Sequence, residues 1–172
     1  FHLHTNTPAV MRWLGGVKSR EDLREVSDRL TRWQEERGFT LWAVERREDA
    51  AFLGFCGLKI ADDPNGSIQG EYEVGWRFRE DSWGHGYARE AATASLDHAF
   101  DRLGAERVFA ITFNQNEASW GLMRRLRMRR RLSPYEERLE LVAEAVQHEV
   151  SARDDDERQQ RRQSQTTHPS NR

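Results

Sequence analysis

The sequence predicts an α/β fold in which helices flank a mixed central sheet. From residue 70 onward, segments typical of strands alternate with helical segments, and this order indicates a helix that crosses between two neighbouring parallel strands. Before residue 70, two strand-like segments on either side of a short charged turn indicate an antiparallel hairpin. The chain has 172 residues, of which 37% are apolar, so its length suits one domain with a sizeable core.

The first half of the chain predicts one helix followed by the hairpin. A capping box at residues 19–22 precedes apolar residues that recur at spacings of three and four, which indicates an amphipathic helix to about Arg37. Gly38 is expected to end this helix. Residues 39–46 and 51–60 are the two expected strands, with charged residues at the hairpin tip between them.

The second half predicts a strand, a long helix, a second strand and a short helix. Residues 70–78 alternate well enough for a strand. A helix then follows the turn that ends at Gly86 and continues to about Leu103, because alanine and leucine side chains share one face. Residues 107–113 form the next expected strand, and Asn116 is a suitable cap for a short helix.

Both ends of the chain carry other patterns. Residues 1–18 are weakly patterned. Residues 133–136 resemble a capping box with proline at the first helical position, and an apolar stripe at helical spacing follows, so residues 133–150 are expected to form an amphipathic helix. Residues 151–172 are polar and lack aromatic side chains, which predicts a disordered tail.

Composition excludes several classes of protein. The single cysteine, Cys56, cannot form an internal disulfide and fits a reducing compartment, and a core thiol is its expected role. The net charge of −2 makes nucleic acid an unlikely partner, and no apolar run is long enough to span a membrane. No signal peptide is evident and the histidines lack metal-ligand spacing, so we expect a cytoplasmic protein without a metal.

The turn within residues 78–92 is the most informative stretch. A strand ends there, two glycines allow a tight backbone path, and a helix begins with free amide groups that favour an anion. One interpretation is a pyrophosphate cradle, and the alternative is an ordinary strand–helix turn. A P-loop sequence is absent, and Arg89 stands where a Rossmann turn needs its third glycine.

Two motifs resemble those of the GNAT superfamily of N-acetyltransferases. Trp83-Gly84-His85-Gly86-Tyr87-Ala88 is similar to the family's motif A, with Trp83 in place of the usual Gln or Arg, and Arg89-Glu90-Ala91 completes a variant typical of the ribosomal-protein N-terminal acetyltransferase branch (RimJ/RimL-like). Asn116-Glu117-Ala118-Ser119, followed by Leu122-Met123 and Leu126-Arg127-Met128, is similar to the second motif. The resemblance covers roughly residues 10–131.

The resemblance implies an acetyl-CoA-binding domain over residues 1–132, with a GNAT-like sheet that is incomplete at both ends. The family's first strand and helix have little room before Val10. After Leu132 the family adds two strands, where this sequence predicts a helix and a tail. Arg127 also replaces the glycine that usually begins the turn into those strands.

The resemblance also implies a cofactor site for acetyl-CoA as cosubstrate, with no metal. The pantetheine arm would lie along the strand at Trp76 to Phe78, the pyrophosphate would bind the glycine turn, and Asn116 would contact the arm. The implied cofactor-binding residues are Trp76, Phe78, Trp83, Gly84, His85, Gly86, Tyr87, Ala88 and Asn116.

For catalysis, the resemblance implies Glu73 as the base that deprotonates the amine. Glu71 shares its strand face and is an alternative, and either carboxylate is otherwise a solvated side chain. Many family members use a tyrosine as the acid where this chain has Met123, so Ser119 is the remaining candidate, unless it only bonds locally in the helix.

The expected function is acetyl-CoA-dependent N-acetylation of a primary amine, either a protein N-terminus or a small molecule. The alternative is a catalytically impaired acetyl-CoA-binding or interaction module. The arginine-rich residues 124–131 raise a third hypothesis, contact with RNA, although a basic helix end is the simpler interpretation. The sequence allows a homodimer but does not determine the oligomeric state.

Overall fold

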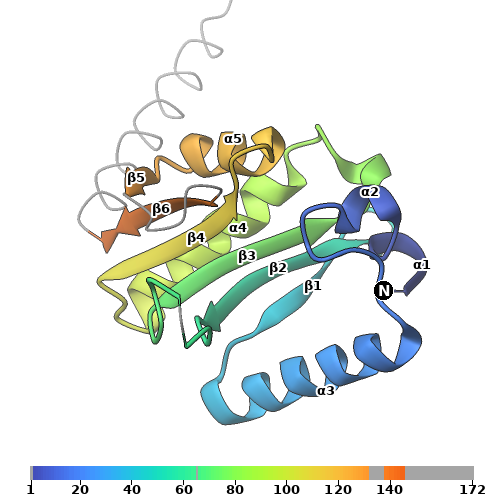
Figure 1. The fold of residues 1–172 in the computed structure, drawn as a ribbon, viewed down its shortest axis with the longest axis horizontal. Helices are drawn as coiled ribbons and strands as arrows, with labels where there is room; N and C mark the ends of the chain where they lie inside the picture. Colours follow the sequence, from blue (N-terminus) through green and yellow to red (C-terminus); the bar gives the residue numbers. More distant parts are fainter. Residues whose placement is uncertain (1, 65, 132–137, 146–172) are drawn as a thin grey trace, which may run out of the picture.

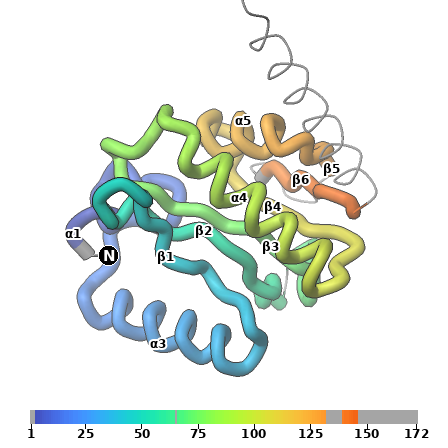
Figure 2. Tube along the Cα trace, turned by 180° about the vertical axis from the view of Figure 1, so that it is seen from behind, coloured from blue at the N-terminus to red at the C-terminus, as the bar shows by residue number. Residues whose placement is uncertain are grey.

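The computed structural model describes residues 2–64, 66–131 and 138–145. A six-stranded sheet has the order β1-β2-β3-β4-β6-β5, in which β3 and β4 are parallel and the other neighbours are antiparallel. α4 lies behind the sheet and α2 lies in front of it in Figure 1, and the opposite view in Figure 2 agrees. The predicted α/β fold with a mixed sheet and flanking helices is therefore confirmed.

The described elements follow one another as helix, hairpin, crossover and a final pair of strands. The helices are α1 (His2–Thr5), α2 (Pro8–Met11), α3 (Arg20–Arg37), α4 (Tyr87–Asp97) and α5 (Glu117–Arg125). The strands are β1 (Leu41–Glu45), β2 (Phe52–Ile60), β3 (Tyr72–Phe78), β4 (Arg107–Phe113), β5 (Arg129–Arg131) and β6 (Arg138–Glu144). α4 continues into a π-helical turn, His98–Arg102, so the predicted long helix is confirmed to within a residue or two of its ends.

α3 begins and ends where its sequence predicts. The Ser19 hydroxyl accepts a hydrogen bond from the Asp22 amide at 3.1 Å, and the Asp22 carboxylate accepts one from the Ser19 amide at 3.0 Å. These bonds to Ser19 lower the pKa of Asp22. Gly38 has φ of 76°, a left-handed conformation that glycine adopts without strain, and its amide donates to the Gln34 carbonyl.

β3 and β4 separate soon after they meet. Their parallel register joins Tyr72 to Val108 and Glu73 to Phe109, and it includes no further pair. β3 nevertheless stays paired with β2 as far as Phe78, while β4 stays paired with β6 as far as its own last residue. The facing edges of the two strands therefore form an opening, along which backbone groups are accessible to an extended ligand.

The main core lies between the sheet and α4. Val74, Leu96 and Val108 are buried in one cluster there. Because successive residues of a strand point to opposite faces, Glu73 and Arg77 lie on the face away from α4. The opening thus has an α4 side that is filled with core side chains and a second side toward the N-terminal segment.

The structure corrects the prediction for residues 133–150. Residues 138–144 form β6, so the predicted helix is wrong over these residues. The rest of the prediction cannot be compared with the structure, because the described residues do not include 133–137, 146–150 and the predicted disordered tail, 151–172. β6 pairs with β4 along the whole of both strands. A helix at this place would leave one edge of β4 without its backbone partners.

Side-chain burial explains the same correction. Leu141 and Ala143 are buried in the core on the α4 side, while Val142 packs against the cluster around Phe109 on the other face. This alternation is that of a strand with two covered faces, although the apolar spacing also fits a helix. The expected gap after β4 is therefore wrong, since β6 and β5 occupy it; no strand precedes β1 among residues 2–40.

Candidate functional site

A cavity of about 1250 Å³ occupies the opening between β3 and β4 and continues toward the N-terminal segment. Both diverging strands, the glycine turn, α5 and parts of residues 9–30 line it. Most site residues predicted from the sequence share this cavity, and they are Glu73, Trp76, Phe78, Trp83, Gly84, Gly86, Ala88, Asn116 and Ser119. Residues that are separated by up to 46 positions in the chain therefore meet because the two strands diverge around one space.

The glycine turn presents its backbone to the cavity without side chains in between. Gly84 and Gly86 have φ of 79° and 88°, which favours glycine, and a Cβ atom built on either would meet no atom within 4 Å. Gly86 caps α4 without a side-chain hydrogen bond, and the Arg89 amide donates to the Gly86 carbonyl, so the amides of Tyr87 and Ala88 are the ones left for a ligand. A helix N-terminus with free amides and open space above it suits a diphosphate.

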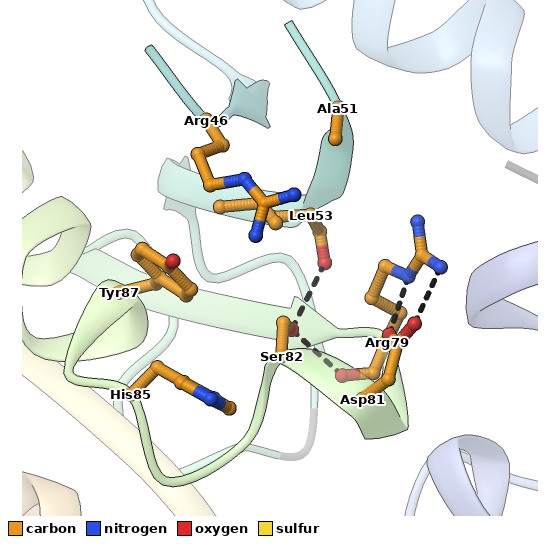
Figure 3. A pocket seen from close by; sticks show the side chains of 8 residues that line it. All are labelled: Arg46, Ala51, Leu53, Arg79, Asp81, Ser82, His85 and Tyr87. Atoms are coloured by element: carbon orange, nitrogen blue, oxygen red, sulfur yellow. Dashed lines mark hydrogen bonds and ion pairs between the residues drawn. The ribbon is translucent and has the colours of Figure 1, made fainter. Parts of the chain in front are cut away.

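Side chains hold the turn against β2 and the end of β3. The Trp83 indole donates to the Phe78 carbonyl at 2.9 Å, and the Ser82 hydroxyl donates to the Arg79 carbonyl at 2.7 Å. Figure 3 shows the second contact from Ser82, a longer hydrogen bond to the Leu53 carbonyl of β2. The position of the turn is therefore set before any ligand arrives, which lowers the entropic cost of binding.

His85 and Tyr87 do not line the large cavity. Their side chains lie in a smaller pocket of about 80 Å³ on the side of the turn toward the β1–β2 hairpin, where their rings stack at 5.8 Å (Figure 3). Arg46 lies beside them and pairs with Asp49, which lowers the pKa of Asp49 to about 2. Only the backbone of these two residues is thus placed for a role in the cradle.

Glu73 is the carboxylate at the narrow end of the opening. Its side chain is 15% exposed and forms a 3.0 Å ion pair with Lys59 of β2, which also lines the cavity. Glu71, the alternative base, is not among the cavity-lining residues and pairs with Arg107 at 2.9 Å. The geometry therefore favours Glu73 over Glu71 for any chemistry inside the cavity.

Ser119 and Asn116 lie at the start of α5. The Asn116 side chain accepts from the Ser119 amide at 3.4 Å and donates to the Thr112 hydroxyl at 3.0 Å, so the predicted helix cap is confirmed. The Ser119 side chain is half-buried and its residue lines the cavity. Met123, one turn further along, is 1% exposed and packs in the core.

Sequence reasoning missed several cavity-lining residues. Glu140 of β6 is buried, faces the cavity and accepts a hydrogen bond from the Ser67 hydroxyl. The Arg77 guanidinium donates to the Met11 sulfur at 3.3 Å, and burial lowers the pKa of Arg77. No local pattern could identify Glu140, because its segment also fits a helix, and Met11 belongs to the weakly patterned residues 1–18.

The arginine-rich stretch 124–131 is only partly a helix end. Arg124 and Arg125 belong to the last turn of α5, whereas the arginines from 129 onward form β5. Arg129 pairs with Glu144 of the neighbouring strand, and the Arg131 guanidinium lies 5.4 Å from the centre of the Phe109 ring. The prediction of a basic helix end is therefore wrong beyond residue 125.

Comparison with known proteins identifies relatives. A family model described as an acetyltransferase (GNAT) domain matches residues 1–129. YkkB of Bacillus subtilis is 34% identical over 119 residues, which cover 69% of this chain and 67% of that protein. No helix within the described residues is long and apolar enough to cross a membrane, and no group of three metal-ligating side chains occurs among them.

Solved structures show the same fold. An acetyltransferase from Agrobacterium tumefaciens is similar with a TM-score of 0.69 at 22% identity, covering 81% of this chain and 80% of that one. The ribosomal-protein-S5-alanine acetyltransferase from Vibrio fischeri is similar with a TM-score of 0.60 at 15% identity, covering 84% and 80%. The predicted resemblance to the ribosomal-protein branch is thus confirmed for the fold.

Proposed function

Because the chain belongs to the GNAT acetyltransferase family, we propose that it transfers the acetyl group of acetyl-CoA to a primary amine. The observation that carries this proposal is the opening between β3 and β4, which ends at the glycine turn within a single cavity. A free strand edge binds an extended arm that contains amide groups, and free amides at a helix N-terminus bind a diphosphate. Coenzyme A has both parts in this order.

The residues of the opening fit that cosubstrate. We assign the pantetheine arm to the β3 edge at Trp76 to Phe78 and the pyrophosphate to the amides of residues 84–88, with Asn116 close to the arm. Bound acetyl-CoA supplies an activated thioester, and the chain's task is to hold it beside the amine. The open space over Gly84 and Gly86 is the space that the phosphates need.

Two proton transfers complete the reaction. Glu73, at the narrow end of the opening, takes one proton from the ammonium group, directly or through a water molecule. The amine nitrogen then bonds to the carbonyl carbon, the carbon–sulfur bond breaks, and the nitrogen's second proton ends on the thiol sulfur. Ser119 is the residue that we assign to deliver a proton to this sulfur, since Met123 cannot donate one. The products are an amide and coenzyme A.

The alternative is a module that binds acetyl-CoA without turning it over. Met123, Arg127 and the expected absence of strands after β4 favour that alternative, but β6 and β5 occupy this part of the sheet. Met123 remains a reason for this alternative, because it lines the cavity where many family members have a tyrosine and it has no proton to donate. A coenzyme A thiolate is a fair leaving group, so we favour the active enzyme.

Cofactor binding is tested by calorimetric titration of the chain with acetyl-CoA. We expect saturable binding at one site, and a Gly86→Val variant should bind at least tenfold more weakly because its side chain fills the cradle. Gly104→Val is the matched control: Gly104 has φ of 64° and open space around it, but it does not line the cavity. A folded chain that binds no acetyl-CoA, or equal losses in both variants, would refute the proposal.

The base assignment is tested with Glu73→Gln. We expect kcat to fall by roughly 10²-fold or more, as is usual for loss of a general base, while the Kd for acetyl-CoA stays unchanged. Glu71→Gln is the control, because it removes a carboxylate that lies just before β3 and outside the cavity. Coenzyme A release would be followed with 2-phenylethylamine, spermidine and a short peptide as acceptors; a fully active Glu73→Gln enzyme excludes this assignment.

A further inference from the structure

The cavity continues beyond the opening into a chamber between the sheet and the N-terminal segment. Asn6 closes residues 6–18 into a loop, because its side chain accepts from the Lys18 amide and donates to the Lys18 carbonyl, both at 2.9 Å. The Trp13 ring lies 6.0 Å from the Phe113 ring at the end of β4. The loop is therefore fastened over the face of the sheet that carries Glu73 and Arg77.

The walls of this chamber are largely apolar. The loop contributes Val10 and Met11, α3 contributes Leu23, and the strands contribute Leu41, Phe55 and Phe113. Val10, Met11 and Leu23 are buried, so these side chains are held in place by packing. An apolar wall of fixed shape favours a ligand with an apolar body, since burial removes apolar surface from water.

Charged side chains of both signs line the cavity, and on its floor Glu73 is paired with Lys59 at 3.0 Å. Glu73 and Glu140 belong to the strands on either side of β4, so carboxylates flank the end of the opening where the acetyl group would lie. Three cations of the loop and α3 also line the cavity, namely Arg12, Lys18 and Arg29. In the whole lining, seven arginine and lysine side chains stand against four carboxylates. This excess accommodates one ammonium group beside Glu73 and Glu140 and disfavours a ligand that carries several cations.

Resting on the acetyl transfer proposed above, we propose that the acceptor is a small monoamine with an apolar, aromatic-sized body. Its ammonium group lies between Glu73 and Glu140, next to the thioester. Its body packs under the loop of residues 6–18, against Val10 and Phe55. Polyamines are disfavoured by the cations of the loop and α3, and a peptide is disfavoured because its polar backbone would be buried against apolar walls.

The test is an acceptor series measured with the full chain, with coenzyme A release as the readout. We expect kcat/KM to rise about fourfold for each methylene from ethylamine to hexylamine, the factor expected for a buried methylene. We further expect 2-phenylethylamine to exceed spermidine and a peptide beginning with alanine by at least tenfold. A flat response to chain length, or a preference for spermidine or the peptide, would overturn the proposal.

A matched pair of variants tests the chamber itself. Val10→Thr keeps the side-chain shape but adds a hydroxyl to the wall, and kcat/KM for hexylamine should fall about fivefold while acetyl-CoA affinity stays unchanged. Val17→Thr is the control, because Val17 belongs to the same loop but is 54% exposed and does not line the cavity. Equal effects of both variants contradict the chamber assignment.

The two proposals fail in different ways. A chain that binds no acetyl-CoA by calorimetry refutes the proposed acetyl transfer. A chain that binds acetyl-CoA and transfers acetyl to spermidine or the peptide, but to none of the apolar monoamines, refutes only the acceptor class. A chain that binds acetyl-CoA but releases coenzyme A with none of the acceptors refutes the proposed acetyl transfer and supports the binding module. Transfer to the apolar monoamines, with the chain-length response described above, supports both.

Discussion

At position 127, glycine is predicted to give a more stable protein than alanine. α5 ends with the Met128 amide bonded to the Met123 carbonyl at 3.1 Å and the Arg127 amide bonded to the Arg124 carbonyl at 3.0 Å. This pair of bonds requires a left-handed residue after the helix, and Arg127 has φ of 59°. An arginine thus occupies a conformation that glycine adopts without a steric penalty.

The magnitude follows from two opposing contributions. A left-handed conformation costs a residue with a Cβ atom about 1–2 kcal/mol. Glycine gives back about 0.4–1 kcal/mol, because it loses more backbone freedom on folding. Arg127→Gly should therefore exceed Arg127→Ala in unfolding free energy by roughly 0.5–1 kcal/mol. Both variants lose the exposed arginine side chain, so their difference isolates the backbone conformation.

Urea unfolding followed by the fluorescence of the six tryptophans measures this difference. Arg130 supplies the opposite control, since it lies in β5 and is not among the residues with positive φ. There the glycine variant should be less stable than the alanine variant by about 0.5–1 kcal/mol. If Arg127→Ala is as stable as Arg127→Gly, the described turn after α5 is wrong.

Three further predictions concern the strand, the thiol and the loop. Leu141→Ala should lower the unfolding free energy by about 2–5 kcal/mol, because the Leu141 side chain is buried in β6 with 4% exposure. Glu144→Ala, on the same strand, should change the unfolding free energy by less than about 1 kcal/mol. Equal small effects of the two variants would argue against a packed strand. Burial raises the pKa of the Cys56 thiol from 9.0 to about 11, so the unfolded chain loses this proton at a lower pH than the folded chain does. The unfolding free energy should therefore fall as the pH rises from about 9 to 11. A Cys56→Ala variant that shows the same fall would contradict this cause. Asn6→Ala should lower the unfolding free energy by about 1–3 kcal/mol, since it removes both bonds from Asn6 to the partly buried backbone of Lys18. Proteolysis within residues 6–18 should then be faster, and unchanged cleavage would count against the closed loop.

The elements that the sequence predicted correctly are those whose signals are local. The capping box before α3 and Gly38 after it act within one helical turn, and Asn116 caps α5 by the same short-range geometry. The turn at Gly84 and Gly86 is equally local, because positive φ is a property of single residues. Such signals need no partner from elsewhere in the chain, so they can be read in order along the sequence.

Part of the candidate site could also be predicted from local sequence motifs. The glycine turn, Glu73 and Ser119 follow from motifs, and these residues line one cavity. The backbone of the turn was predictable, but the direction of its side chains was not: His85 and Tyr87 point into the smaller pocket beside Arg46. Their direction depends on the hairpin that packs next to them, which lies 40 residues earlier in the chain.

The sequence alone determined the fold class, the order of elements from α3 to α5, and the turn that suits a diphosphate. The tertiary structure decided the rest, since it depends on which distant segments meet. Residues 138–144 form a strand because β4 offers them a backbone edge. Glu140 and Arg77 join the cavity because β3 and β4 diverge and residues 6–18 fold over them, and long-range contacts of this kind leave no period in the sequence.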